Sequence, residues 1–173
     1  MLRSGLFALA ITAIMLGAVS PARAADSDAR REVRDRAEIE QLAWRYARAL
    51  DTLNGEAYAQ LYAEDGQFGT GAKAVKGRAA LTKFINGLKQ DAAAREAKGE
   101  PKTPPMYHMV MNSYLEFLDK DHARLHAYEM TVFAPSGPGV KVNIGAAGRT
   151  VDELVRTSEG WRIKVRDIAP QQD

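Results

Sequence analysis

The stretch MYHMVMNSYLEFLDKDHARLHAYEMTVF, residues 106–133, holds two runs rich in apolar and aromatic residues around the turn Asp119-Lys120-Asp121. Runs of this kind joined by short turns are typical of neighbouring antiparallel strands. Two further runs follow, residues 140–157 and 161–168, with the turn Ser158-Glu159-Gly160 between them. The C-terminal part of the chain is therefore predicted to be an antiparallel meander.

The residues ahead of this meander have helical periodicity. Residues 36–51 carry one apolar stripe at spacings of three and four, formed by Ile39, Leu42, Ala43, Tyr46, Ala49 and Leu50. Asn54 is predicted to cap a short second helix that runs through Tyr62. A third helix is predicted after Lys76-Gly77, with Leu81, Phe84, Ile85 and Leu88 on one face.

Between the second and third helices, residues 67–75 are predicted to form a short strand or hairpin. Helices first and a meander second are typical of an α+β domain, in which a sheet packs against the three N-terminal helices.

Residues 1–24 have the organisation of a cleavable signal peptide. Arg3 precedes an apolar run from Gly5 to Val19, and Ala22-Arg23-Ala24 provides the small residues of a cleavage site. The apolar run is short for a membrane span. We expect cleavage after Ala24, export to the periplasm or the medium, and no stable membrane insertion afterwards; an uncleaved anchor is the alternative.

The rest of the chain has the size of one domain. Residues 25–35 are polar and are expected to form a flexible lead-in, residues 36–168 the domain, and residues 169–173 a tail. The chain has 24 Lys plus Arg against 22 Asp plus Glu. Two of the basic residues and no acidic residue lie in the predicted signal, so the mature domain would be nearly neutral. No nucleic-acid partner is expected, because such a protein needs a basic face.

The chain has no Cys and only three His. This excludes disulfides, a thiol nucleophile and thiolate metal ligands. His108, His122 and His126 show no ligand spacing together with carboxylates, so no metal and no other cofactor is expected. A disulfide-free exported domain depends on its core or on a partner subunit, which makes a homodimer reasonable.

Asp51 and His108 are the candidate catalytic residues. Asp51 ends the first helix, and His108 follows Pro104-Pro105 on the first strand of the meander. A carboxylate at a helix C-terminus meets the unfavourable end of the dipole, and if buried it needs a donor. An imidazole would supply that donor and gain basicity as a general base. The alternative is a solvated helix-end Asp51 and a satisfied core His108.

Three segments occur in an order shared with a known family. The first holds Ile39-x-x-Leu42, Ala49-Leu50-Asp51 and YAQLYAEDGQF at residues 58–68. The second is Lys76-Gly77-Arg78. The third holds His108-x-x-x-Asn112-x-x-Leu115-Glu116-Phe117, Gly148-x-x-x-Asp152-x-x-Val155-Arg156 and Gly160-Trp161-Arg162-Ile163. In these segments the chain resembles the SnoaL-like branch of the NTF2-like superfamily, which includes polyketide cyclases, scytalone dehydratase, ketosteroid isomerase and lindane dehydrochlorinase.

The resemblance implies a cone in which three helices cap a strongly curved, mixed and largely antiparallel sheet. A mostly apolar pocket for a small hydrophobic molecule opens at the wide end, and members often dimerise through the outer sheet face. In the dehydratase and dehydrochlorinase members, the residues matching Asp51 and His108 form a pair in which the histidine is the base.

Four further residues are predicted to bind substrate: Tyr46, Asn112, Tyr114 and Arg156. Strand alternation places Asn112 and Tyr114 on the face of His108, although Asn112 at a strand bend is an equal alternative. Arg156 matches the pocket arginine of the dehydrochlorinase, with Asp152 as its expected partner; an exposed strand arginine is the alternative. Tyr46 replaces the lysine of that enzyme.

These observations predict a cofactor-independent lyase or isomerase in which His108 removes a proton from carbon and Asp51 orients the imidazole. Two other classes stay open: a noncatalytic periplasmic binding module for an apolar molecule, and a dimeric interaction scaffold with a filled cone. An open cavity beside a bonded pair favours the enzyme, an open cavity with the pair apart favours the carrier, and a plugged cone favours the scaffold.

Overall fold

The computed structural model describes residues 21–135, 137, 139 and 141–169. The predicted signal, apart from its last four residues, and most of the predicted tail lie outside this range. The chain divides into two units, residues 1–33 and 34–173. No helix in the described part of the chain is both long and apolar enough to cross a membrane.

In the first unit, the described residues belong to the start of helix α1 (Pro21–Asp51). The segment predicted as a flexible lead-in is thus helical, and α1 begins well before Arg36. Arg30 pairs with Asp26, and Arg31 with Asp28, both at 2.8 Å. Ion pairs three and four residues apart stabilise this part of the helix, and its Ala and Arg residues have high helix propensity.

In the second unit, the apolar stripe of α1 is buried as predicted. Helix α2 (Gly55–Ala59) follows, and the side chain of Asn54 accepts a hydrogen bond from the backbone N–H of Ala57 at 3.0 Å, which confirms the predicted N-cap. Helix α3 (Arg78–Ala97) buries Leu81 and Ile85. Together with residues from the inner face of the sheet, the three helices form one core, whose largest fully buried side chains are Trp161, Tyr58, Tyr62, Ile39, Leu81, Ile85 and Ile163.

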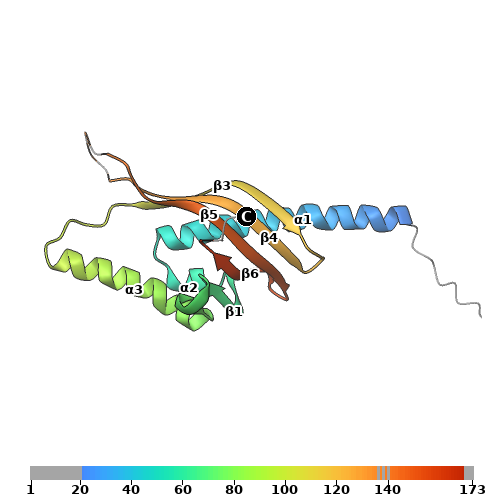
Figure 1. Ribbon diagram of the computed structural model, residues 1–173, viewed down its shortest axis with the longest axis horizontal. Coiled ribbons are helices and arrows are strands. Elements are labelled where there is room, and N and C mark those ends of the chain that lie inside the picture. The colour runs from blue at the N-terminus through green and yellow to red at the C-terminus, as the bar shows by residue number, and fades with distance from the viewer. Residues whose placement is uncertain (1–20, 136, 138, 140, 170–173) are drawn as a thin grey trace, which may run out of the picture. The chain divides into compact units, whose positions relative to one another are not determined.

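The sheet has six strands in the order β2-β1-β6-β5-β4-β3. The strands are β1 (Tyr62–Phe68), β2 (Val75–Lys76), β3 (Met106–Phe117), β4 (His122–Phe133), β5 (Asn143–Thr157) and β6 (Gly160–Asp167), and a short 3-10 helix, η1 (Gly71–Lys73), lies between β1 and β2. Figure 1 shows β3, β4 and β5 as a curved band of long strands. The predicted meander and the α+β class are confirmed.

Strand β1 pairs in parallel with β6, which makes the sheet mixed, whereas all other pairs are antiparallel. This pairing ends α2 at Ala59, before the predicted Tyr62, because Tyr62 already pairs with Ile163. A Cβ added to Gly66 would lie 2.7 Å from the carbonyl oxygen of Ile163. Only glycine therefore allows the two backbones to approach this closely.

Strand β3 contains a bulge at Asn112, the residue for which a strand bend was the alternative prediction. Met111 pairs with Tyr128 and Tyr114 with His126, so two residues of β3 lie opposite one residue of β4. Asn112, within the bulge, has a φ of 49°, a left-handed conformation that asparagine adopts more readily than most residues. The extra residue turns Tyr114 to the outer face, where it is 64% exposed and its ring lies 5.9 Å from that of His126. The prediction that Tyr114 shares the face of His108 is wrong.

The N-cap gives a test of how the turn between α1 and α2 is stabilised. Replacing Asn54 with alanine is expected to lower the free energy of unfolding by about 1 kcal/mol, because a backbone N–H at the start of α2 loses its acceptor. Asn54→Asp keeps an acceptor and is expected to stay within about 0.5 kcal/mol of the wild type. Urea unfolding followed by circular dichroism measures both values, and equal stability of all three proteins would contradict the role of the cap.

Candidate active site

The end of α1 and the start of β3 bring Asp51 and His108 together. Oδ1 of Asp51 accepts hydrogen bonds from the backbone N–H of His108 at 2.8 Å and from its ring Nδ1 at 3.0 Å. The two side chains are only 8% and 11% exposed. Oδ2 of Asp51 lies 3.4 Å from a guanidinium nitrogen of Arg48, one turn earlier on α1. The carboxylate thus has the donors that its position at a helix C-terminus requires.

The contact with Asp51 determines the tautomer of the His108 ring. A carboxylate only accepts hydrogen bonds, so Nδ1 carries the hydrogen in this contact. In the neutral imidazole the lone pair then lies on Nε2, which has no hydrogen-bond partner among the described residues. The ring is oriented by one nitrogen and is free to accept a proton at the other.

His108 lines a cavity of about 280 Å³ between the helices and the inner face of the sheet. Its walls are mostly apolar. They are formed by Leu50 of α1, Phe68 of β1, Phe84 and Leu88 of α3, Ala146, Ala147 and Gly148 of β5, and Ile168. Its polar side chains are His108, Tyr46, Glu129, Thr131 and Thr150. A mostly apolar space with a few convergent polar groups is the usual form of a small-molecule site.

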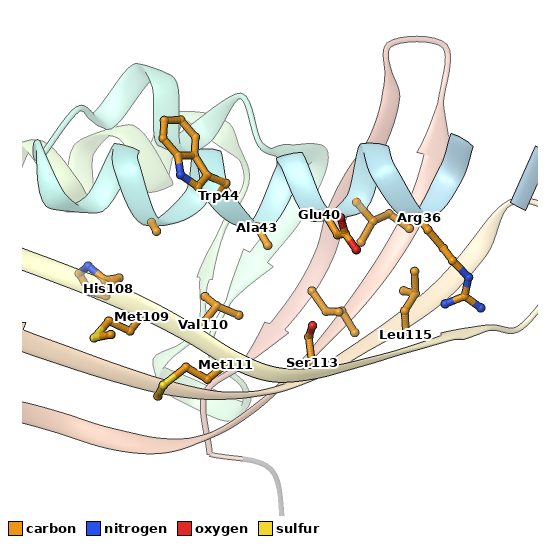
Figure 2. A pocket seen from close by; sticks show the side chains of 13 residues that line it. Arg36, Glu40, Ala43, Trp44, His108, Met109, Val110, Met111, Ser113 and Leu115 are labelled. Carbon is orange, nitrogen blue, oxygen red and sulfur yellow. The ribbon is translucent and has the colours of Figure 1, made fainter. Parts of the chain in front are cut away.

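A second, larger groove of about 510 Å³ reaches the other side of His108. Figure 2 shows this groove where α1 runs alongside β3, with Arg36, Glu40 and Ala43 turned toward the strand. Met109, Val110 and Met111 line it from β3. His108 is therefore accessible from two hollows, but only the inner cavity combines it with Tyr46 and Glu129.

A buried arginine links two carboxylates beside the inner cavity. Arg166 of β6 is 3% exposed and donates to Asp152 of β5 and, at 2.6 Å, to Oε2 of Glu129 of β4. Its guanidinium carbon lies 3.8 Å from the centre of the Tyr46 ring. Burial raises the pKa of Asp152 to about 6, although the Arg166 cation acts in the opposite direction. Oδ1 of Asp152 and Nε of Arg166 are buried without a partner among the described residues.

Three tyrosines pack next to this arginine. Tyr58 and Tyr62 share a hydrogen bond of 2.7 Å between their hydroxyls, and the Tyr46 ring lies 5.5 Å from that of Tyr58. Burial raises the pKa of Tyr46 well above its usual value, and Arg166 only partly offsets this. The Tyr46 hydroxyl therefore stays protonated and can donate a hydrogen bond.

The structure brings some of the predicted site residues together and separates others. His108 and Tyr46 line the inner cavity, and Asp51 contacts the His108 ring without lining the cavity itself. Asn112 is exposed and lines neither of the two hollows that His108 lines.

Arg156 also lies away from these hollows. It pairs with Asp35 and Asp121, and its guanidinium lies over the Trp161 ring at 4.6 Å from the centre. The expected pairing of Arg156 with Asp152 is wrong, because Asp152 binds Arg166 instead.

Sequence reasoning missed Glu129 and Arg166. Glu129 was within reach, because alternation along β4 places it on the face of Ala123, Leu125 and Ala127, which are buried. Arg166 could not be predicted in this way. The register between β5 and β6 shifts between Glu153 and Leu154, and this shift reverses the alternation of inward and outward side chains after Ile163. The described residues contain no group of three His, Asp or Glu placed to hold a metal ion.

A model of the SnoaL-like domain matches residues 31–167, most of the chain. The chain belongs to the SnoaL-like family. None of the curated proteins compared with it matches. This SnoaL-like protein is similar in structure to an NTF2-like protein with a cystatin-like fold from Novosphingobium aromaticivorans, at 26% identity, a TM-score of 0.67, and coverage of 88% of this chain and 91% of the other.

Two further structures share the fold of this SnoaL-like protein. One is a Mycobacterium tuberculosis protein of unknown function, at 25% identity, a TM-score of 0.60, and coverage of 78% and 75%. The other is a Catenulispora acidiphila protein in complex with S-DNPA, at 21% identity, a TM-score of 0.59, and coverage of 75% and 88%. The predicted NTF2-like fold, a curved sheet against three helices, is thereby confirmed.

Proposed function

We propose that this SnoaL-like protein is a cofactor-independent lyase or isomerase whose His108–Asp51 dyad removes a proton from carbon of a small hydrophobic substrate. The observation that carries the proposal is the 3.0 Å contact between Asp51 Oδ1 and His108 Nδ1, beside a cavity that the same ring lines. A carboxylate that holds the imidazole by one nitrogen leaves the other nitrogen ready to act as a general base.

The reaction begins with transfer of a carbon-bound proton to Nε2 of His108. The electrons of the broken C–H bond move into a neighbouring carbonyl of the substrate, and Asp51 stabilises the imidazolium that forms. The Tyr46 hydroxyl donates a hydrogen bond to the enolate oxygen. In an isomerase the imidazolium returns the proton to a different carbon. In a lyase the enolate electrons instead expel a leaving group from the adjacent carbon.

The cavity and the family support this function. The apolar walls of the cavity suit a small hydrophobic molecule. A protein of the same fold, from Catenulispora acidiphila, was solved in complex with a small molecule, S-DNPA. The polar groups are few and lie on one inner sheet face with Tyr46 opposite. This arrangement orients a substrate with its reactive carbon toward the dyad.

Proton abstraction can be tested without the natural substrate. In D2O, the protein is expected to accelerate deuterium incorporation next to the carbonyl of at least one ketone in a panel of 2-tetralone, 2-indanone and cyclohex-2-enone, followed by NMR. Exchange no faster than in buffer for every ketone would overturn the enzymatic proposal. Ketones that bind without exchange would instead identify a noncatalytic binding module.

We also propose export with cleavage after Ala24 and assembly as a homodimer. The outer sheet face supports the dimer, because it exposes large apolar side chains of β3, β4 and β5, among them Tyr114, Tyr128 and Ile144. The intact mass of the protein recovered from the periplasm tests the cleavage. Sedimentation equilibrium tests the dimer.

A further inference from the structure

Glu129 is an ionisable group that the proposed reaction does not use, although it lines the same cavity as His108. Its Oε2 accepts from Arg166 at 2.6 Å, whereas Oε1 has no hydrogen-bond partner among the described residues. The side chain is only 13% exposed. Because Glu129 lines the cavity, a ligand bound there can supply the donor that Oε1 lacks within the protein.

The register of the sheet places Glu129 close to the dyad. His108 pairs with Thr131 and Val110 pairs with Glu129, so Glu129 is the diagonal neighbour of His108 on the adjacent strand. Diagonal neighbours are about 7–8 Å apart. One small ring system can therefore present a carbon to His108 and a polar substituent to Glu129 at the same time.

The charges around the cavity decide which substituent fits. Among the residues that the structure describes, no lysine or arginine lines the cavity, and the nearby Arg166 already holds Asp152 and Glu129. A ligand carboxylate would face Glu129 without a cation to neutralise it. A hydroxyl would donate to Oε1 and satisfy it.

We propose that Glu129 is a specificity-determining residue that makes the cavity select neutral hydroxylated ring compounds over carboxylates. This inference deepens the proposed function, since it uses the same cavity, but it concerns binding and does not require turnover. Arg166 is the positioning residue that turns one oxygen of Glu129 away and leaves the other for the ligand.

Three probes that share one ring system separate the effect of a hydrogen-bond donor from the effect of a negative charge at pH 7. They are 2-naphthol, 2-methoxynaphthalene and 2-naphthoate. At this pH a phenol is neutral and a carboxylate is charged. Calorimetric titration is expected to show that 2-naphthol binds about 10-fold or more tightly than either of the others, because a hydrogen bond to a charged group contributes at least this much. Methoxynaphthalene lacks the donor, and naphthoate adds like charge.

Glu129→Gln is expected to reduce the ratio of naphthol to naphthoate affinity by about 10-fold, since the amide removes the charge and keeps the shape. Glu153→Gln, which changes an exposed carboxylate on β5 of the same sheet, is expected to leave the ratio unchanged. If Glu129→Gln fails to fold, the relative affinities of the three probes for the wild-type protein still test the inference.

Naphthoate binding as tightly as naphthol, a ratio that survives Glu129→Gln, or no binding of any probe would overturn the inference. Selective binding of 2-naphthol without deuterium exchange of any ketone would contradict the catalytic proposal but not this inference. Deuterium exchange without selective binding of 2-naphthol would contradict this inference but not the catalytic proposal.

Discussion

Replacement of His108 with alanine is expected to lower the rate of deuterium exchange, for the ketone that the wild type exchanges fastest, by about 10²- to 10⁴-fold. This is the usual contribution of a positioned general base. The side chain that takes the proton is then absent, whereas the apolar walls and Tyr46 stay in place. NMR in D2O gives the rate, and binding of the same ketone by calorimetry should change by less than about 10-fold.

Asp51→Asn tests the second half of the dyad. The amide keeps the size of the carboxylate but loses the charge that stabilises the imidazolium, so we expect a rate loss of about 10²-fold or more. The affinity for the ketone should again change little, because Asp51 orients the base and does not line the inner cavity.

The chain offers a matched control for both variants. His122 Nδ1 lies 3.0 Å from Asp119, which reproduces the contact of the dyad at a site where both side chains are 56% exposed. His122→Ala should exchange the ketone at the wild-type rate. Wild-type rates in His108→Ala and Asp51→Asn would remove the dyad from the mechanism, and a loss in His122→Ala of the same size would show that the effect is not specific to the cavity.

Periodicity predicted the parts of the fold that depend on local pattern. The stripe from Ile39 to Leu50, the cap at Asn54 and the four strands of the meander all follow from spacing and turn residues. The mixed sheet was expected only from the family resemblance, since the parallel pairing of β1 with β6 joins residues about a hundred positions apart. Local sequence carries no signal for such a pairing.

The candidate site, like the fold, could be predicted only in part from the sequence. The contact of Asp51 with His108 was predicted, because helix-end chemistry and the family pattern pointed to the same two residues. Tyr114 was placed on the wrong face, because one extra residue in β3 reverses the alternation. Arg166 was missed for the same reason on β6. Bulges set which side chains reach the cavity, and their positions depend on how neighbouring strands pack.

Arg166→Met is expected to lower the free energy of unfolding by about 3–5 kcal/mol at pH 7. The substitution keeps most of the side-chain volume but removes the cation from two carboxylates, and a buried charge without its partner is strongly destabilising. Asp152 is only 5% exposed, so water cannot replace the guanidinium at this carboxylate. Total stabilities of about 5–15 kcal/mol leave the variant marginal. Urea unfolding monitored by fluorescence measures the difference.

The pH dependence distinguishes lost charge pairing from lost packing. In the wild type, the Asp152 pKa of about 6 lies above the value of about 3.9 in an unfolded chain. Its contribution to stability is therefore present below pH 4 and is lost as the pH rises through 6. Without Arg166 the folded pKa rises further, so the variant loses more stability over the same rise, and the difference from wild type should shrink toward pH 4.

Arg124→Met provides the control, since Arg124 is an exposed arginine on β4. It should change the unfolding free energy by less than about 0.5 kcal/mol at either pH. A cost of Arg166→Met that stays constant from pH 7 to pH 4 would mean that the arginine acts through packing against Tyr46 alone. A cost that falls with the pH would show that the arginine acts by holding Asp152 ionised.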